Sequence, residues 1–242
     1  MLRIPDFTKR SEAAELMDDY SIGGHELTEA LAQLRRINLL LGAAFPLLEG
    51  VMYWWRQAGQ PSCLTILDVG AGSGDLNHLL LRWATLRRVH LRITLLDIHP
   101  DTCAVAAAYY HDEPRIQVQQ GDVFTLPPQC ADIVTASLFT HHFPDPQLPA
   151  VVAALTRAAR VGVVINDLER HPVAWASIWL LTRLFSRNRM ICHDAPLSVR
   201  RGFRRPDFER LRAYPGLTRL HYRWRPLFRY LVTLPGSAGV SV

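Results

Sequence analysis

The segment LDVGAGSGDL (67–76) overlaps the end of an apolar run, CLTILDVG (63–70), and leads into a helical pattern that extends to about residue 86. A short apolar run that is stopped by glycines is typical of a buried parallel strand. Glycines in the connecting turn let the backbone bend tightly and approach a ligand that a Cβ would repel. The segment therefore predicts a strand, a ligand-binding turn and a helix, in that order.

The chemistry of this turn narrows the choice of ligand. Its glycines follow G-x-G-x-G, which differs from the dinucleotide fingerprint G-x-G-x-x-G, and no Gly-Lys-Ser/Thr of a phosphate loop follows. Asp68 lies just before the turn, where its carboxylate would repel a pyrophosphate and attract a cation. We therefore expect a ligand that carries positive charge.

The alternation of strand-like runs and helical patterns continues after this segment as far as Leu168. The expected strands are 63–70, 91–99, 115–123, 131–139 and 161–168, and the expected helices are 74–86, 100–113 and 146–160. Strands that alternate with helices indicate a parallel sheet covered on both faces. Because crossovers are right-handed, a doubly wound α/β sheet is the natural topology.

Both ends of the chain depart from this alternation. Residues 1–60 show helical periodicity and no strand, which predicts an N-terminal helical cap on a domain formed by residues 61–242. An apolar helical pattern at 171–190 predicts a helical insertion after the fifth strand, at about 170–203. A helix at 204–216 and an antiparallel strand pair, 217–225 and 227–234, would then close the sheet.

Acidic residues follow the first three expected strands. Asp97 closes the second strand, where a carboxylate can accept two hydrogen bonds from ribose hydroxyls. Asp122 follows the third strand and could accept from an adenine amino group, while Val123 presents a backbone N–H. Each could instead be a helix cap or a turn residue. With Asp68, however, they lie at the carboxyl edge of the sheet, where ligands of open α/β folds bind.

In these segments the chain resembles class I S-adenosylmethionine-dependent methyltransferases. Within that family it is most similar to the ubiquinone/menaquinone-type and natural-product small-molecule enzymes. The matching stretches are LDVGAGSGDL, LLDIHP, QGDVFTLP and ADIVTASLFTHHF, over about residues 63–165. The resemblance implies a seven-stranded, mostly parallel, Rossmann-like sheet with a reversed last strand. It also implies an S-adenosyl-L-methionine site formed by Asp68, Gly70, Ala71, Gly72, Asp97, Ile98, Asp122, Val123 and Ser137.

Two adjacent histidines follow the fourth expected strand. His141 and His142 lie at its carboxyl end, where the transferred methyl group should point. An imidazole suits proton removal because its ordinary pKa, ~6.5, lies near working pH. We expect one of the pair to be the general base and the other to orient or pack; alternatively, they cap the next helix or line the pocket. The Asn/Asp-Pro-Pro-Tyr/Phe segment of amine-methylating relatives is replaced by Ser137-Leu138-Phe139-Thr140, which lowers the expectation of DNA-amine or protein-amide methylation.

The apolar segment at 171–190 indicates the kind of substrate that receives the methyl group. Trp175, Ile178, Trp179 and Leu181 with Phe185 approximate one face of a helix. We expect this helix and the N-terminal helices to form a lid that excludes water from an apolar substrate. The same face could pack on the sheet, form a homodimer contact or dip into a membrane surface.

Charge is distributed unevenly along the 242 residues. Residues 1–169 carry 13 basic and 19 acidic side chains, whereas residues 170–242 carry 14 and 3, and all 14 basic residues there are Arg. Arg200, Arg201, Arg204 and Arg205 form the densest cluster, which we interpret as a solvated face or as a partner of the acidic residues near the N-terminus. A basic region also suits RNA, so a nucleic-acid partner stays as an alternative that we consider unlikely.

The remaining composition defines the setting. Four dispersed cysteines and ten histidines without H-E-x-x-H spacing predict no disulfide framework and no metal site. No apolar stretch reaches the ~18 residues of a membrane span, and we expect a cytoplasmic protein.

Our leading hypothesis is O-methylation of a hydroxyl on a small apolar or aromatic metabolite, polyketide- or quinone-like. The alternatives are C-methylation of a similar phenol or enol, RNA methylation, and an inactive nucleotide-binding regulator.

Overall fold

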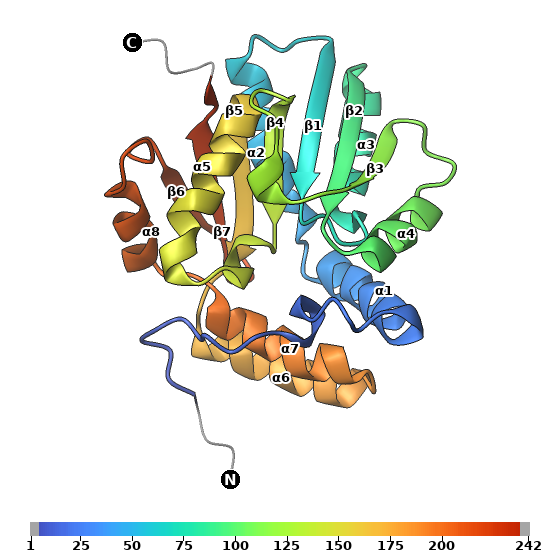
Figure 1. The fold of residues 1–242 in the computed structure, drawn as a ribbon, viewed down its shortest axis with the longest axis vertical. Helices are drawn as coiled ribbons and strands as arrows, with labels where there is room; N and C mark the ends of the chain where they lie inside the picture. The colour runs from blue at the N-terminus through green and yellow to red at the C-terminus, as the bar shows by residue number, and fades with distance from the viewer. Residues whose placement is uncertain (1–4, 238–242) are drawn as a thin grey trace.

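A computed structural model describes residues 5–237 of the chain, and its centre is a seven-stranded sheet (Figure 1). The strand order is β3-β2-β1-β4-β5-β7-β6, and only the pairs that involve β7 are antiparallel. The strands are β1 (Cys63–Val69), β2 (His90–Asp97), β3 (Ile116–Gln120), β4 (Ala131–Ser137), β5 (Ala159–Leu168), β6 (His221–Arg225) and β7 (Arg229–Pro235). The doubly wound sheet with a reversed strand is therefore confirmed.

Helices cover both faces of this sheet. One face carries α5 (Leu148–Ala158) and α8 (Arg205–Arg212), and the other carries α2 (Ala44–Gln57), α3 (His78–Arg87) and α4 (Pro100–Tyr109). Ile66 of β1 packs into the second layer and its neighbour Leu67 into the first. Because successive side chains point to opposite faces, a strand covered on both sides reads as a continuous apolar run.

The two N-terminal helices have different positions. α1 (Gly24–Leu40) lies across the carboxyl edge of the sheet, beside α4, as expected of a cap (Figure 1). α2 instead packs on the sheet, where the Trp54 indole N–H donates to the carbonyl of Val163 at 3.0 Å. Gly162 permits this contact, since a Cβ there would lie 2.2 Å from the Trp54 ring. The first 60 residues therefore contribute both to the cap and to the covering layer of the sheet.

The insertion after β5 contains two helices. The single helix expected over 171–190 ends at Phe185 as α6 (Pro172–Phe185), and α7 (Arg189–Arg201) begins after a short break. Asn188 causes the new start, because its side chain accepts the backbone N–H of Ile191 and so caps α7. The apolar face is also narrower than expected, since Trp175 and Ile178 are buried while Phe185 is 80% exposed.

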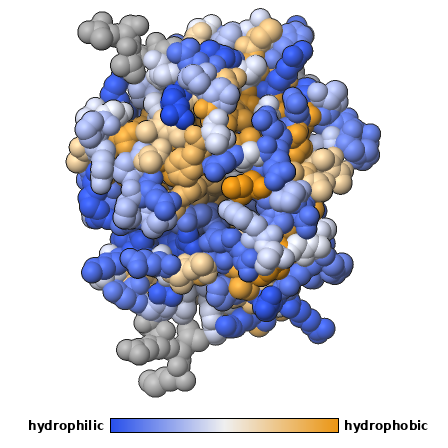
Figure 2. Space-filling view, viewed as in Figure 1, coloured by the Kyte–Doolittle hydropathy of each residue, from blue (hydrophilic) through white to orange (hydrophobic). Residues whose placement is uncertain are grey.

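Many arginines of the carboxyl region are structural. Arg170, Arg201 and Arg229 are buried. Of these, Arg201 belongs to the cluster of Arg200, Arg201, Arg204 and Arg205, so that member does not form the solvated face that was one expectation. Arg201 donates to Asp18 at 2.9 Å, as expected of a pairing with the acidic N-terminal region. On the face drawn in Figure 2, hydrophilic side chains predominate over the lower part of the molecule, where the N-terminal segment and the α6–α7 insertion lie.

Within residues 5–237, no single helix has both the length and the apolar composition of a membrane span. Only α1 and α2 together pass that test, and they are bent by 71° at their junction.

Candidate active site

A cavity of about 820 Å³ lies at the carboxyl edge of the sheet. Its floor is formed by the ends of the parallel strands, and its cover is formed by residues 11–20 (the N-terminal strap), α1, α6 and α7 (Figure 1). Small-molecule sites have volumes of about 300–1,000 Å³, so this cavity has room for a nucleotide-sized molecule and a second one. The predicted site residues that line it are Gly70, Ala71, Gly72, Asp97, Ile98, Asp122, Val123, Ser137, His141 and His142.

The glycine turn forms the part of the floor above β1. Gly70 and Gly72 have φ of +63° and +57°, a left-handed conformation that side chains disfavour. A Cβ on Gly70 would lie 2.0 Å from the ring of Phe139, which belongs to the loop after β4. The glycine therefore lets the loop after β4 pack directly against the glycine turn.

The two acidic residues after β2 and β3 lie where the sequence suggested. The Asp97 carboxylate accepts the backbone N–H groups of Gly72 and His99, each at 3.0 Å, and so connects the first two strand ends. Burial is the largest influence on Asp97 and raises its pKa. Asp122 accepts the backbone N–H of Phe124 at 2.9 Å and caps a short helical turn while it lines the cavity. Asp122 therefore both caps this turn and faces the cavity.

Asp68 lies behind the glycine turn and does not line the cavity. Its carboxylate accepts from Asn77 at 2.6 Å and from Thr135 at 2.7 Å, so a direct contact with the cofactor is not part of this geometry. Burial raises the pKa of Asp68 to about 6; Asp75 and Asp97 add to this, and the two hydrogen bonds oppose it. The three carboxylates create a negative field at the turn, which favours a cationic ligand.

We predict that Asp68 makes unfolding depend on pH. The folded-state pKa is above the ordinary 3.8, so the stabilisation from its proton is complete below pH 3.8 and is lost as pH rises through about 6. Relative to Asp68→Asn, the wild-type chain should lose about 2 kcal/mol of unfolding free energy between pH 4 and pH 7. Urea denaturation of both proteins across this range measures the difference. A difference that stays constant with pH would contradict the assigned pKa.

His141 is held by the end of the neighbouring strand. Its Nδ1 lies 2.6 Å from Oδ1 of Asp167, and its backbone N–H and the Thr140 hydroxyl both reach Oδ2 of Asp167. Asp167 is fully buried, and burial alone would raise its pKa. The charge of His141 and the hydrogen bonds from His141 and Thr140 outweigh this effect and lower the pKa of Asp167 to about 2. An ionised carboxylate at Nδ1 places the proton there and leaves Nε2 as the free nitrogen.

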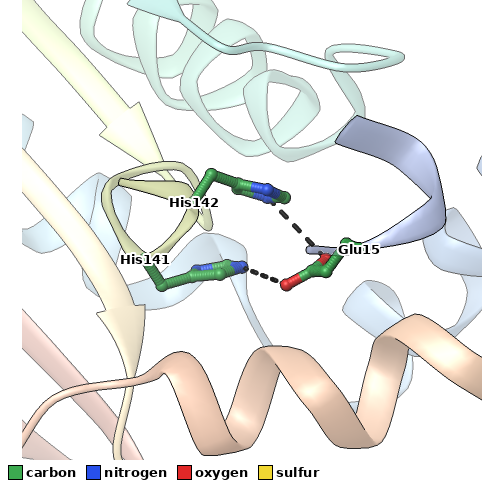
Figure 3. A group of neighbouring side chains, drawn as sticks. All are labelled: Glu15, His141 and His142. Carbon is green, nitrogen blue, oxygen red and sulfur yellow. Dashed lines mark ion pairs between the residues drawn. The ribbon is translucent and has the colours of Figure 1, made fainter. Parts of the chain in front are cut away.

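His142 repeats this arrangement with a partner from the N-terminal strap. Its Nδ1 lies 2.6 Å from Oδ1 of Asp18, and its ring stacks on that of His141 with centroids 4.4 Å apart. Both imidazoles point toward Glu15, another residue of the strap (Figure 3). Burial lowers the pKa of His142, but the carboxylates of Glu15 and Asp18 outweigh it and raise the pKa. Among residues 5–237, Glu15, His141 and His142 form the group of side chains with the spacing of metal ligands.

Asp167, Glu15 and Asp18 were not predicted as site residues. Asp167 had a detectable signal, because Asn166 and Asp167 are polar residues at the end of an otherwise apolar buried strand. No periodicity or spacing marks Glu15 or Asp18, which reach the site by the path of the N-terminal strap.

The other half of the cavity is mostly apolar. α1 contributes Leu31, Leu34 and Ile37, and α6 contributes Ala174 and Ile178. Among the described residues, three buried polar groups in the wall lack hydrogen-bond partners: Oε1 of Glu15, the Ser137 hydroxyl, and the Nε and Nη1 of Arg229. An unpartnered buried polar group costs free energy unless a ligand satisfies it. Ser137 therefore fits the position near the cofactor that was expected of it.

Comparison with known proteins agrees with this geometry. Residues 66–162 match the family described as "Methyltransferase domain". No curated protein matches the sequence.

Solved structures with the same fold include three that cover most of the chain. A Methanococcus maripaludis protein provisionally described as an S-adenosyl-L-methionine-dependent methyltransferase has a TM-score of 0.60 at 14% identity, over 91% of this chain and 98% of that one. Magnesium protoporphyrin IX methyltransferase from Synechocystis, with bound S-adenosylhomocysteine, has a TM-score of 0.52 at 14% identity, over 79% and 82%. The DszA carbon methyltransferase has a TM-score of 0.53 at 18% identity, over 74% of this chain and 48% of that one.

The fold, the cavity above the glycine turn and the match over residues 66–162 define one class of domain within this chain: a methyltransferase domain. Solved structures with this Rossmann-like fold include a methyltransferase that holds S-adenosylhomocysteine or S-adenosylmethionine.

Proposed function

We propose that the chain transfers the methyl group of S-adenosylmethionine to a hydroxyl oxygen of a small, apolar or aromatic acceptor. The observation that carries the proposal is the His141–Asp167 pair, which fixes an imidazole in the cavity with Nε2 free to receive a proton. A hydroxyl becomes a strong nucleophile once its proton is removed.

The bound cofactor supplies an electrophilic methyl group on a sulfonium centre, and the chain supplies position and proton transfer. Gly70, Gly72 and Asp97 would hold the cofactor at the strand ends, as the resemblance suggested. Leu31, Ile37 and Ile178 would hold the acceptor and exclude water. In-line substitution depends mainly on such positioning, since aligned reactants gain about 7–11 kcal/mol from proximity.

C-methylation of a phenol or enol is the second candidate, because it needs removal of the same type of proton. Similarity of fold to a carbon methyltransferase is compatible with it but does not favour it over oxygen. The two reactions differ in product, since a methyl ether and a C-methylated ring have different spectra and different stability to acid.

RNA methylation finds less support in the geometry. A shallow basic groove of about 430 Å³ lies between α8 and β6 and includes Arg205, Arg212 and Trp224, but it shares no lining residue with the cofactor cavity. RNA affinity that falls steeply with salt would favour this alternative.

The function is tested first at the cofactor. Calorimetry with S-adenosylhomocysteine should show one site per chain, and Gly70→Ala should weaken binding by about 100-fold, because its Cβ displaces Phe139 and strains a left-handed backbone. Gly216→Ala is the matched control: Gly216 also has a left-handed φ, but a Cβ there meets nothing within 4 Å. Equal affinity of the Gly70→Ala and Gly216→Ala proteins would contradict the cofactor geometry.

The acceptor is tested second. Radiolabelled methyl transfer should be detected with members of a panel of hydroxylated aromatic compounds and not with homopolymeric RNA. Absence of binding of S-adenosylmethionine would overturn every form of the proposal. Transfer to RNA alone would overturn the choice of acceptor.

A further inference from the structure

The Glu15–His141–His142 cluster contains three ligand-type atoms that face one another without forming hydrogen bonds. Nε2 of His141 lies 3.6 Å from Oε1 of Glu15, and Nε2 of His142 lies 4.0 Å from Oε2. Hydrogen bonds of this type measure about 2.7–3.2 Å. Glu15 is only 4% exposed, and its Oε1 has no hydrogen-bond partner. The cluster thus encloses a gap lined by a carboxylate oxygen that has no hydrogen-bond partner.

The spacing matches that of a metal site. All three ligand atoms lie within 4.8 Å of one another. Ligands held at about 2.0–2.1 Å in a tetrahedron lie about 3.4 Å apart, so small side-chain movements would bring these atoms onto one cation. Two imidazoles and one carboxylate also form the protein ligand set of known catalytic zinc sites.

The surroundings orient both imidazoles as ligands. Asp167 accepts from Nδ1 of His141 and Asp18 from Nδ1 of His142, each at 2.6 Å. A metal-binding histidine almost always donates its other N–H to a carboxylate or carbonyl, which fixes the tautomer and raises ligand basicity. Here both Nε2 atoms are directed at Glu15 (Figure 3). A pair of histidines that only packed in the wall would not need this duplicated arrangement.

The charges near the cluster also favour a cation. The carboxylates of Glu15, Asp18 and Asp167 exceed the guanidinium groups of Arg201 and Arg229 by one negative charge. Arg201 does not fill the gap: its Nε lies 3.8 Å from Glu15 and donates to the carbonyl of His141 at 3.0 Å. A dication together with one acceptor oxyanion would make the cluster neutral.

We infer that Glu15, His141 and His142 bind one divalent transition-metal ion, with Zn²⁺ the best fit to this ligand set. Imidazole and carboxylate ligands suit such borderline ions, and three protein ligands leave the fourth position of a tetrahedral site for an acceptor oxygen. The inference deepens the proposed function and rests on it for its role. On this inference, the two histidines activate the acceptor hydroxyl by binding an ion, and neither histidine removes the proton itself.

The reaction then balances without a further reagent. The acceptor O–H binds the ion, which lowers the pKa of the hydroxyl, and its proton passes to water. The oxygen attacks the methyl carbon, an O–C bond forms, the C–S bond breaks, and sulfur keeps the electron pair. The products are the methyl ether, S-adenosylhomocysteine and one proton.

Cobalt is the direct probe, because Co²⁺ replaces Zn²⁺ and has visible absorption that depends on its ligands. The purified full chain is loaded with Co²⁺ and desalted, and its metal content and spectrum are measured. We expect one tightly held Co²⁺ per chain, which Zn²⁺ displaces. Glu15→Gln and His142→Ala should lose the bound ion, and Asp18→Asn should weaken binding about 10- to 100-fold.

His111→Ala is the matched control, because His111 also pairs with a carboxylate, Asp112, but both side chains are exposed. It should keep the ion. Thermal melting of each variant confirms that the protein is folded. Less than about 0.2 Co²⁺ per wild-type chain, or equal retention by Glu15→Gln and wild type, would overturn the inference.

The same preparations separate the two proposals. If S-adenosylhomocysteine binds and methyl transfer proceeds in metal-free buffer without loss, the metal inference is wrong while the proposed function stands. If the ion binds at the cluster but no S-adenosylhomocysteine binds, the site is supported and the proposed function is wrong.

Discussion

Replacement of His141 by Ala should lower kcat for an identified acceptor by about 10²- to 10⁴-fold, the range that loss of a proton-transfer group produces. His141 lies in the cavity wall, and Asp167 fixes its ring by a 2.6 Å hydrogen bond. The same loss is expected whether His141 takes the proton itself or binds an ion that lowers the pKa of the acceptor hydroxyl. Single-turnover measurement of methyl transfer checks the prediction.

Two further variants make this result specific. His141→Gln keeps a polar side chain of similar size and can still bond Asp167, but it cannot take a proton, so it should be as inactive as the Ala variant. Asp167→Asn should also lower kcat, because an amide at this position favours the wrong imidazole tautomer. S-Adenosylhomocysteine affinity should change less than about 3-fold in all three. Activity above about one third of wild type in both His141 variants would show that this residue is not used.

Replacement of Asp207 by Ala should destabilise the fold by about 3–5 kcal/mol, because it leaves a buried charge without its partner. Arg170 is 2% exposed and donates from Nη1 to Oδ2 of Asp207 at 3.0 Å. The same guanidinium donates to the carbonyls of Phe7 and Gly202, at 3.0 and 2.6 Å. The pair therefore connects the chain after β5 with the N-terminal segment and the end of α7. The midpoint of urea denaturation measures the effect.

The control for this prediction is an exposed ion pair on the same helix. Glu209 lies 3.3 Å from Arg212 in α8, and Glu209→Ala should cost no more than about 1 kcal/mol. Removing both members of the buried pair, by Arg170→Met with Asp207→Ala, should recover part of the loss, since no uncompensated charge then remains. If Asp207→Ala costs as little as Glu209→Ala, the buried pair does not hold the fold together.

The part of the cavity formed by the strand ends could be predicted because its signals are local. The strand, turn and helix around Gly70 are contiguous in the chain, and the left-handed φ of Gly70 and Gly72 explains why glycine is needed there. Asp97 and Asp122 could be placed beside them because the carboxyl ends of parallel strands meet at one edge. The break between α6 and α7 was missed, because the cap of Asn188 lies inside an apolar pattern that looks continuous.

The partners of the histidines could not be predicted with equal ease. Asp167 lies 26 residues after His141 and reaches it because β4 pairs with β5 in a register that places Ser137 opposite Asn166. Asp18 lies 124 residues before His142 and reaches it only when the N-terminal strap crosses the cavity. Hydrophobic periodicity carries no information about such a path, since the strap has no repeating pattern.

The amino-acid sequence by itself therefore established the sheet, the glycine turn after β1 and the location of the two histidines at a strand end. These depend on side-chain periodicity and on glycine geometry, which act over a few neighbouring residues. The tertiary structure established what the histidines can do, because the directions of their nitrogens depend on Asp167, Asp18 and Glu15. Those three carboxylates come from distant segments, and only the burial of the strap and of the β5 end brings their charges to the imidazoles.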